Sequence, residues 1–195
     1  MKNLLITGFN PFGGEEINPA WEAVSILPKI IGEYNIHPLL IPTEFENAFP
    51  RILDAAKTIR PDVIISVGQA GGRKDVTPEM VAINLKYAGI PDNAGEMPKD
   101  EPVAADGPDA YFATIPVRKM ADAIRHAGLP GSVSYSAGTF VCNTVMYSVL
   151  HHYKNTDVKA GFIHVPYLPE QAKNGQPYMT LQDICRALET AILAL

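Results

Sequence analysis

Short apolar runs that stop at a glycine are the feature of this sequence that most restricts its fold. Residues 3–8 (NLLITG) form one such run, and residues 62–67 (DVIISV) form another immediately before Gly68. Apolar runs of this length, bounded by a turn residue, predict buried strands. Similar patterns occur at residues 36–41 and 160–165 (AGFIHV). We expect these four segments to be core strands.

The stretches between these strands have the apolar spacing of amphipathic helices. Five helices are predicted, at residues 19–32, 45–59, 117–127, 141–153 and 180–195. Strands that alternate with helices of this length are typical of α/β proteins, in which helices cover a largely parallel sheet. We therefore expect a three-layer α/β/α sandwich with a mostly parallel, mixed central sheet.

The length and charge of the chain limit the number of domains and the kinds of partner. A chain of 195 residues with 47% hydrophobic content suffices for one core, so we expect a single domain over residues 1–195. The formal net charge of −5 disfavours nucleic acids and anionic membranes, because binding phosphates requires a basic surface. No stretch approaches the roughly 18 apolar residues of a membrane span, and no secretory signal is evident. We expect a cytoplasmic protein.

Residues 89–116 fit neither a helix nor a strand. The segment has no apolar period and contains five prolines, Pro91, Pro98, Pro102, Pro108 and Pro116. A long irregular segment in a compact domain is usually a functional loop, a lid or an interface arm. We predict such a role for this segment.

The two cysteines have different contexts. Cys142 lies in SAGTFVCNTVMYSVL, where Gly138 ends a strand-like stretch and helical spacing follows, so Cys142 falls in the first turn of a helix. Helix N-terminal N–H groups lower the pKa of a thiol there and can stabilise an oxyanion. A buried packing role is an equally good interpretation. Cys185 lies in the apolar stripe of a predicted helix, where a packing role is favoured.

His164 and Glu79 are candidates to assist a nucleophilic thiol. His164 ends the strand AGFIHV, and functional groups of open α/β sheets collect beyond the carboxyl ends of strands. A core histidine bonded to a backbone carbonyl is the alternative. The remaining histidines fit structural or solvated positions: His37, His126, His151 and His152. Glu79 follows a glycine-rich turn and can orient an imidazole, although a lone Glu is more often a solvated surface residue.

Two glycine-rich segments follow predicted strands. GQAGGR at residues 68–73 allows a ligand to approach the backbone or simply forms a tight turn, and it lacks the nucleotide-binding signatures. GFNPFGG at residues 8–14 places Phe9 and Phe12 on a loop, where they pack on the core or on a flat apolar ligand. No CxxC pair and no HExxH motif occur, so we expect no metal site.

These segments resemble the type I pyroglutamyl peptidases, which are cytosolic cysteine peptidases of α/β fold. The resemblance runs nearly end to end through GFNPFGG, IPTEF, GQAGGR, VTPEMVAIN, IPDN, DGPDAYF, SAGTFVCNTVMY and GFIHVPYLPEQ, in that order. It implies a catalytic triad of Glu79, Cys142 and His164. The implied reaction removes an N-terminal pyroglutamyl residue from peptides by acyl transfer to Cys142 and hydrolysis of the thioester, without a metal or organic cofactor.

The same resemblance implies a pocket for the five-membered pyroglutamyl ring. Aromatic and aliphatic side chains would enclose the ring, and the chain near Thr43 and Gln69 would meet its amide edge. The implied pocket residues are Phe9, Phe12, Thr43, Gln69, Ile90, Phe140 and Val141. A homotetramer is also implied, and residues 89–116 and the C-terminal helix are its candidate contact surfaces.

Three positions depart from the family pattern, and two other functions stay open. Met80 replaces a basic residue, Tyr135 replaces a common Asn, and Gly89 replaces an Arg that is thought to help neutralise the oxyanion. The last change implies a lower rate or a larger role for the backbone at Cys142. One alternative is a nucleoside phosphorylase-like enzyme, which would need Arg73 and Lys74 for phosphate. The other is a non-enzymatic binder of pyroglutamyl peptides.

Overall fold

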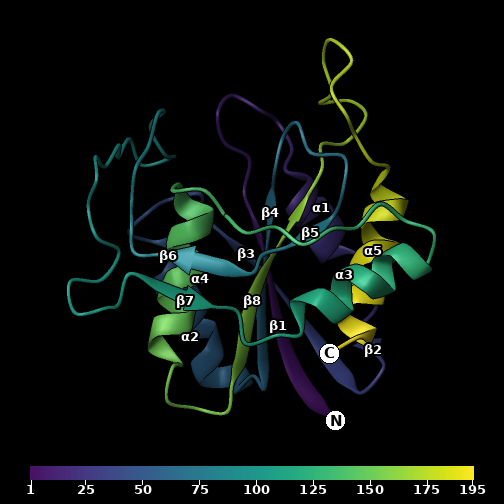
Figure 1. Cartoon of the computed structure of the whole chain (residues 1–195), viewed down its shortest axis with the longest axis horizontal. Helices are drawn as coiled ribbons and strands as arrows, with labels where there is room; N and C mark the ends of the chain where they lie inside the picture. Colours follow the sequence, from purple (N-terminus) through teal and green to yellow (C-terminus); the bar gives the residue numbers. More distant parts are fainter.

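The computed structural model describes residues 1–195 and has a six-stranded mixed sheet at its centre (Figure 1). The strand order is β2-β3-β1-β4-β8-β5. The four long strands run parallel: β1 (Lys2–Phe9), β3 (Tyr34–Ile41), β4 (Val63–Gln69) and β8 (Lys159–Val165). Two short strands pair antiparallel at the edges, β2 (Ile30–Ile31) and β5 (Thr77–Pro78). The four predicted strands and the mostly parallel, mixed sheet are confirmed.

Helices cover both faces of this sheet, which gives the expected three layers (Figure 1). One face carries α1 (Pro19–Ser25), α3 (Val117–His126) and α5 (Leu181–Leu193), and the other carries α2 (Ala48–Ile59) and α4 (Val141–His152). Successive strand residues point to opposite faces. Leu4 of β1 therefore joins the core under α1, α3 and α5, whereas Leu5 joins the core under α2 and α4. Each helix is too short or too polar to span a lipid bilayer.

The predicted helix over residues 19–32 is wrong in its second half. α1 ends at Ser25, and residues 30 and 31 form β2 instead. Pro28 explains the early end, because proline lacks the N–H that a helix interior requires and disfavours helical geometry in the residue before it. The start is set by Asn18, whose side chain accepts a hydrogen bond from the N–H of Ala20 at 3.1 Å. The other four helices agree with prediction to within a few residues at each end.

Residues 89–116 contain a strand that the sequence pattern does not predict. β7 (Ala110–Phe112) pairs antiparallel with β6 (Val81–Ile83) in a separate two-stranded sheet. Most of the remaining segment is irregular and is held by side chains of the body. Asn84, for example, accepts a hydrogen bond from the N–H of Val103 at 2.8 Å. Val103 and Ala104 also pack against the core under α2 and α4, so the segment lies on that side of the molecule.

Candidate active site

The carboxyl ends of β4 and β8 lie side by side and form the centre of the site. Gly68 of β4 is paired in register with His164 of β8. Paired residues in a sheet direct their substituents to the same face. That face is the one covered by α2 and α4, since the neighbouring Phe162 belongs to their core. His164 is buried there, with its ring centroid 4.8 Å from that of Phe162.

Cys142 lies in the first turn of α4, as the helical spacing predicts. A Cβ added to Gly68 would come within 2.9 Å of Cys142 Sγ and 2.7 Å of the Phe162 ring. The thiol therefore sits directly over Gly68, and the pairing of Gly68 with His164 places it beside the imidazole. No hydrogen bond joins Sγ to the His164 ring in this structure. Such catalytic contacts commonly tighten only when substrate binds.

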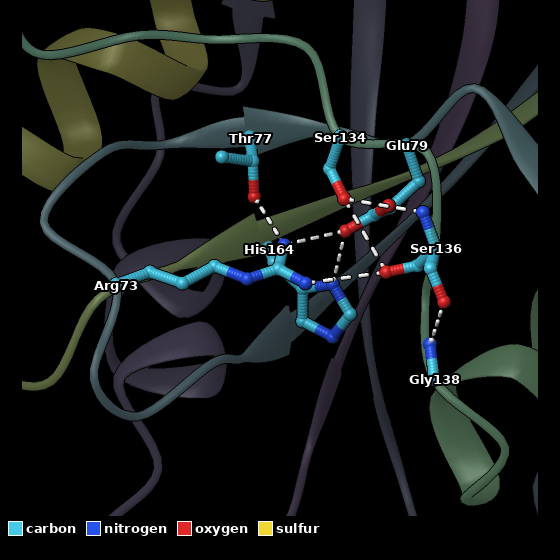
Figure 2. Close-up of polar contacts among 7 residues, drawn as sticks. All are labelled: Arg73, Thr77, Glu79, Ser134, Ser136, Gly138 and His164. Atoms are coloured by element: carbon cyan, nitrogen blue, oxygen red, sulfur yellow. Dashed lines mark hydrogen bonds and ion pairs between the residues drawn. The ribbon is translucent and has the colours of Figure 1, made fainter.

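Glu79 directly follows β5 and reaches His164 from the edge of the sheet. Its N–H donates to the carbonyl of Phe162 at 2.9 Å, and its side chain is completely buried. Oε1 of Glu79 lies 2.7 Å from Nδ1 of His164 (Figure 2). An ionised carboxylate can only accept a hydrogen bond, so Nδ1 carries the hydrogen. Nε2 of His164 is therefore the nitrogen that is free to accept a proton.

Arg73 belongs to the same cluster, although the sequence suggests it only for phosphate binding. Its Nη1 donates to Oε1 of Glu79 at 2.7 Å and to Oγ1 of Thr77 at 2.8 Å, and its Nη2 donates to the carbonyl of Ser136 at 3.2 Å (Figure 2). Oε2 of Glu79 is buried without a hydrogen-bond partner. The one sequence signal for Arg73 is its place in a glycine-rich turn six residues before Glu79.

Burial and the neighbouring charges set the protonation of this cluster. Burial alone would raise the pKa of Glu79, but the hydrogen bond and charge of His164, together with hydrogen bonding from Ser134 and Arg73, outweigh it and lower that pKa. Burial lowers the pKa of His164, against the opposing effect of Glu79. At neutral pH the cluster therefore contains an ionised Glu79 and a neutral His164.

The expected lowering of the Cys142 pKa is wrong for this arrangement. Burial raises the pKa of the Cys142 thiol to about 12, the charge of Glu79 adds to the increase, and Arg73 opposes it. The N-terminus of α4 does not make up for the loss of water around the sulfur. The resting site thus holds a neutral thiol beside a neutral imidazole. The thiol must lose its proton during its attack on a substrate rather than before it.

The first turn of α4 leaves backbone donors free beside the thiol. Phe140, the residue before the helix, makes no side-chain capping hydrogen bond, and the first N–H groups of a helix have no acceptor within it. Asn143 uses its side chain elsewhere, since it accepts from the N–H of Ile83 and donates to the carbonyl of Ile83, both at 2.9 Å. This pair of bonds ties the first turn of α4 to β6. Free N–H groups next to a nucleophile are donors that can stabilise an oxyanion.

Three of the expected pocket residues lie at or near the surface. Phe12 and Phe140 are partly exposed, and their ring centroids are 6.0 Å apart. Phe45 packs edge-on against Phe140 at 5.2 Å and extends this aromatic cluster. Ile90 is 49% exposed, and its side chain lies close to Gly13 of the loop that carries Phe12. These residues form an apolar surface at the carboxyl edge of the sheet.

The other four expected pocket residues are more enclosed. Phe9 is the last residue of β1, so the prediction that it lies on the loop is wrong; with Val141 it is buried in the core under α2 and α4, against which Phe140 packs. Thr43 is also buried, and its hydroxyl donates to the carbonyl of Asn10 at 2.9 Å. Gln69 accepts a hydrogen bond from Nε2 of Gln171 at 3.0 Å. Asn10 and Gln171, which the sequence pattern does not single out, thus hold two of the expected polar contacts in place.

The remaining sequence candidates lie apart from the cluster or beside it without a polar contact. Cys185 is half-buried in α5, where burial raises its pKa and its sulfur lies 3.8 Å from the carbonyl of Ala23. Met80 packs on the core under α1, α3 and α5, and Tyr135 is exposed. Gly89 is exposed, and no atom lies within 4 Å of a Cβ added to it. No group of three or more His, Cys, Asp or Glu side chains is arranged to hold a metal ion.

The fold and the site together define a class of protein. A thiol at a helix N-terminus, a buried imidazole and an orienting carboxylate at the carboxyl edge of an α/β sheet form the arrangement of a cysteine hydrolase. The family model for pyroglutamyl peptidase matches residues 2–195. The chain belongs to the pyroglutamyl peptidase family.

Individual relatives agree with this assignment over nearly their full length. The pyrrolidone-carboxylate peptidase of Escherichia fergusonii is 52% identical over 99% of this chain and 92% of its own, and that of Levilactobacillus brevis is 53% identical over 98% and 96%. The crystal structure of pyroglutamyl peptidase I from Bacillus amyloliquefaciens superposes with a TM-score of 0.96 at 42% identity, covering 100% of this chain and 96% of that one. The structure of the pyrrolidone carboxyl peptidase of Thermococcus litoralis superposes with a TM-score of 0.95 at 39% identity, covering 100% of this chain and 93% of that one.

Proposed function

We propose that Cys142, His164 and Glu79 carry out the reaction of this enzyme, a cysteine peptidase that removes an N-terminal pyroglutamyl residue from peptides. The 2.7 Å contact between Glu79 and His164, beside a thiol seated over Gly68, is the observation that supports these roles most strongly. It leaves Nε2 of His164 unprotonated and close to the one cysteine at a helix N-terminus. The reaction then proceeds through acyl transfer.

In the first half of the reaction, the pyroglutamyl group moves to the enzyme. Sγ of Cys142 attacks the carbonyl carbon of the scissile amide while Nε2 of His164 takes the thiol proton. The N–H groups of the first turn of α4 stabilise the resulting oxyanion. The tetrahedral intermediate collapses with cleavage of the C–N bond, and the imidazolium gives its proton to the departing amine. Glu79 stabilises the imidazolium while it exists.

In the second half, water releases the product. Nε2 of His164 takes a proton from a water molecule as the water oxygen attacks the thioester carbonyl. The second tetrahedral intermediate expels the Cys142 sulfur, which recovers its proton from His164. Free pyroglutamate leaves, and the thiol and neutral imidazole are restored. No step calls for a redox change, since only proton and acyl transfers occur.

The substrate pocket of this proposal lies over the aromatic cluster of Phe12, Phe45 and Phe140. The apolar faces of the lactam ring contact Phe12, Phe140 and Ile90, with Phe9 and Val141 packed behind them. The chain at Thr43 and Gln69 meets the amide edge of the ring. A proline ring has the same shape without the carbonyl, so it would lose the hydrogen bonds that the lactam makes at this edge, and we expect the pocket to reject it.

Hydrolysis of a chromogenic pyroglutamyl amide tests the function, and the matching prolyl amide tests the pocket. We expect turnover of the first and not of the second. Cys142→Ser should abolish turnover, whereas Cys185→Ser is the matched control and should leave it nearly unchanged. Equal losses in the two variants would contradict the assignment of the nucleophile. Saturable binding of a pyroglutamyl peptide without turnover would favour the non-enzymatic binder.

The nucleoside phosphorylase-like alternative is less well supported. Arg73, its main candidate for phosphate binding, already donates to Glu79, Thr77 and Ser136. Phosphate-dependent cleavage of a nucleoside that persists after thiol alkylation would favour this alternative.

Assembly as a homotetramer in the cytoplasm is part of the same proposal. Large apolar side chains are exposed on both surfaces that are candidates for contacts, with Phe112 72% exposed in residues 89–116 and Leu193 65% exposed at the end of α5. Both cysteines are free, which suits a reducing compartment. Sedimentation at working concentration tests the assembly, and a persistent monomer would refute it. Cell fractionation tests the location.

A further inference from the structure

Arg73 is the positive charge in contact with the buried Glu79–His164 pair. Its Nη1 and Nδ1 of His164 both lie 2.7 Å from the same carboxylate oxygen of Glu79 (Figure 2). A buried carboxylate next to a neutral imidazole is strongly unfavourable unless a cation compensates it. The ion pairs of Glu79 are those with Arg73 and His164. Arg73 therefore compensates the negative charge of Glu79, and the Glu79–His164 pair does not need to bind an additional proton.

We propose that Arg73 is a positioning residue for the reaction, whose guanidinium keeps Glu79 ionised and His164 neutral at rest, so that Nε2 stays free for the thiol proton. The inference rests on the catalytic roles proposed above and goes beyond them, because it assigns the protonation of the pair to a fourth residue. It also gives the glycine-rich turn a function that its sequence does not reveal.

Loss of the guanidinium charge would change where protons reside. The buried carboxylate would then retain its charge only by sharing a proton with His164, and the pair would bind that proton at a higher pH than in the native enzyme. An imidazole that is already protonated cannot act as the base. The Arg73 charge opposes protonation of His164 and favours ionisation of Cys142. Loss of the Arg73 charge would raise the pKa of both groups, so it changes proton transfer from Cys142 to His164 less than it changes the uptake of an extra proton from solvent.

The geometry of Arg73 favours an arginine over a lysine. The guanidinium fork contacts Glu79, Thr77 and Ser136 at once, and Ser136 lies in the segment that leads to Cys142. A lysine would keep the charge but could not span these three acceptors in the same way.

The titratable and charged groups around the pair come from several elements. Cys142 faces it from α4. Tyr167, from the segment after β8, packs on Gly71 in the turn of Arg73. Lys74 and Asp75 line an outer cavity of about 370 Å³ together with Arg73. Neither Glu79 nor His164 forms an ion pair with Tyr167, Lys74 or Asp75.

The experiment compares the pH dependence of kcat/KM for a pyroglutamyl amide in three substitutions of Arg73. Arg73→Met removes the charge and the donors, Arg73→Gln removes the charge but keeps an N–H donor, and Arg73→Lys keeps the charge. Arg118→Met, at an exposed position, is the matched control. We expect the acid limb to move to higher pH by about one unit or more in the Met and Gln variants. It should stay near the native position in the Lys variant and in the control.

Titration of the His164 ring proton by NMR, assigned with His164→Gln, provides a readout that does not depend on activity. The proposal predicts the same upward displacement there, and Arg73→Gln keeps the test valid if Arg73→Met fails to fold. An equal loss of activity at every pH, with both the acid limb and the ring titration unmoved, would overturn it. A native enzyme that fails to hydrolyse the amide would refute the proposed function instead, while the ring titration would still decide the role of Arg73.

Discussion

Substitution of Gly68 by alanine should disable the thiol with a limited effect on the fold. The new Cβ would lie 2.7 Å from Cζ of Phe162 and 2.9 Å from Sγ of Cys142, and real Cβ atoms do not approach other atoms this closely. The φ angle of Gly68 is not in the left-handed region, so alanine is tolerated by the backbone. The strain must be relieved by movement of the sulfur, the Phe162 ring, or both. Overpacking of this kind costs about 1–3 kcal/mol of unfolding free energy.

The effect on catalysis should exceed the effect on stability. A displacement of about 1 Å at a reacting atom can reduce the rate on the order of 10²-fold. We therefore expect Gly68→Ala to lower kcat for a pyroglutamyl amide by about that factor, with a modest fall in Tm.

Gly161→Ala is the matched control, because its Cβ would press on the side chain of Ile115 in the core under α1, α3 and α5, on the face of the sheet opposite the thiol. It should lower Tm while kcat stays near native. Native kcat in Gly68→Ala, or equal losses of kcat in both variants, would refute the placement of the thiol over Gly68.

Three further predictions concern the charges of the site. Glu79→Gln should lower kcat by on the order of 10²- to 10⁴-fold with little change in KM, because an amide no longer stabilises the imidazolium of His164; steady-state kinetics will show it, and a native kcat would contradict it. Gly89→Arg should raise kcat, by at most about 10²-fold, since the family resemblance implies that an Arg at this position helps to neutralise the oxyanion and the space around Gly89 is open to the new side chain; an unchanged kcat would mean that the α4 backbone suffices. The pKa of Cys142 is raised from 9.0 to about 12, so the folded state retains a proton that the unfolded state loses, and stability should fall as pH rises above 9.0. Denaturant titrations of the native protein and of Cys142→Ser should show this fall in the difference between their unfolding free energies, with a slope of at most about 1.4 kcal/mol per pH unit. A difference that does not change with pH would argue against a buried neutral thiol.

Most of the fold follows from local sequence pattern, and the exceptions have local causes. The apolar runs before Gly8 and Gly68 identify β1 and β4 correctly, because buried parallel strands have a strong compositional signal. The helix predicted over residues 19–32 is too long, because the apolar spacing continues past Pro28 whereas the helix ends before this proline. The sequence pattern does not predict β7, because Ala110–Phe112 is short and lies among prolines, and its pairing with β6 is formed by residues distant in sequence.

The sequence predicts where the site residues lie in their helices and strands, but it does not predict properties that depend on how deeply those residues are buried. Helical spacing places Cys142 at the start of α4, and the strand pattern places His164 at the carboxyl end of β8. The pKa shift of Cys142 was predicted with the wrong sign, because a helix N-terminus is visible in sequence but the surrounding packing is not. The contact of Arg73 with Glu79 depends on the path of the turn between them, which composition does not specify.

Covalent labelling tests the central claim most directly. A pyroglutamyl chloromethyl ketone offers the ring to the pocket and an electrophilic carbon to the nucleophile, which displaces chloride and forms a stable thioether. Peptide mass spectrometry after inactivation should find one label per chain, on Cys142, and free pyroglutamate should slow the labelling. A label on Cys185, or inactivation at an equal rate by the prolyl analogue, would contradict the account.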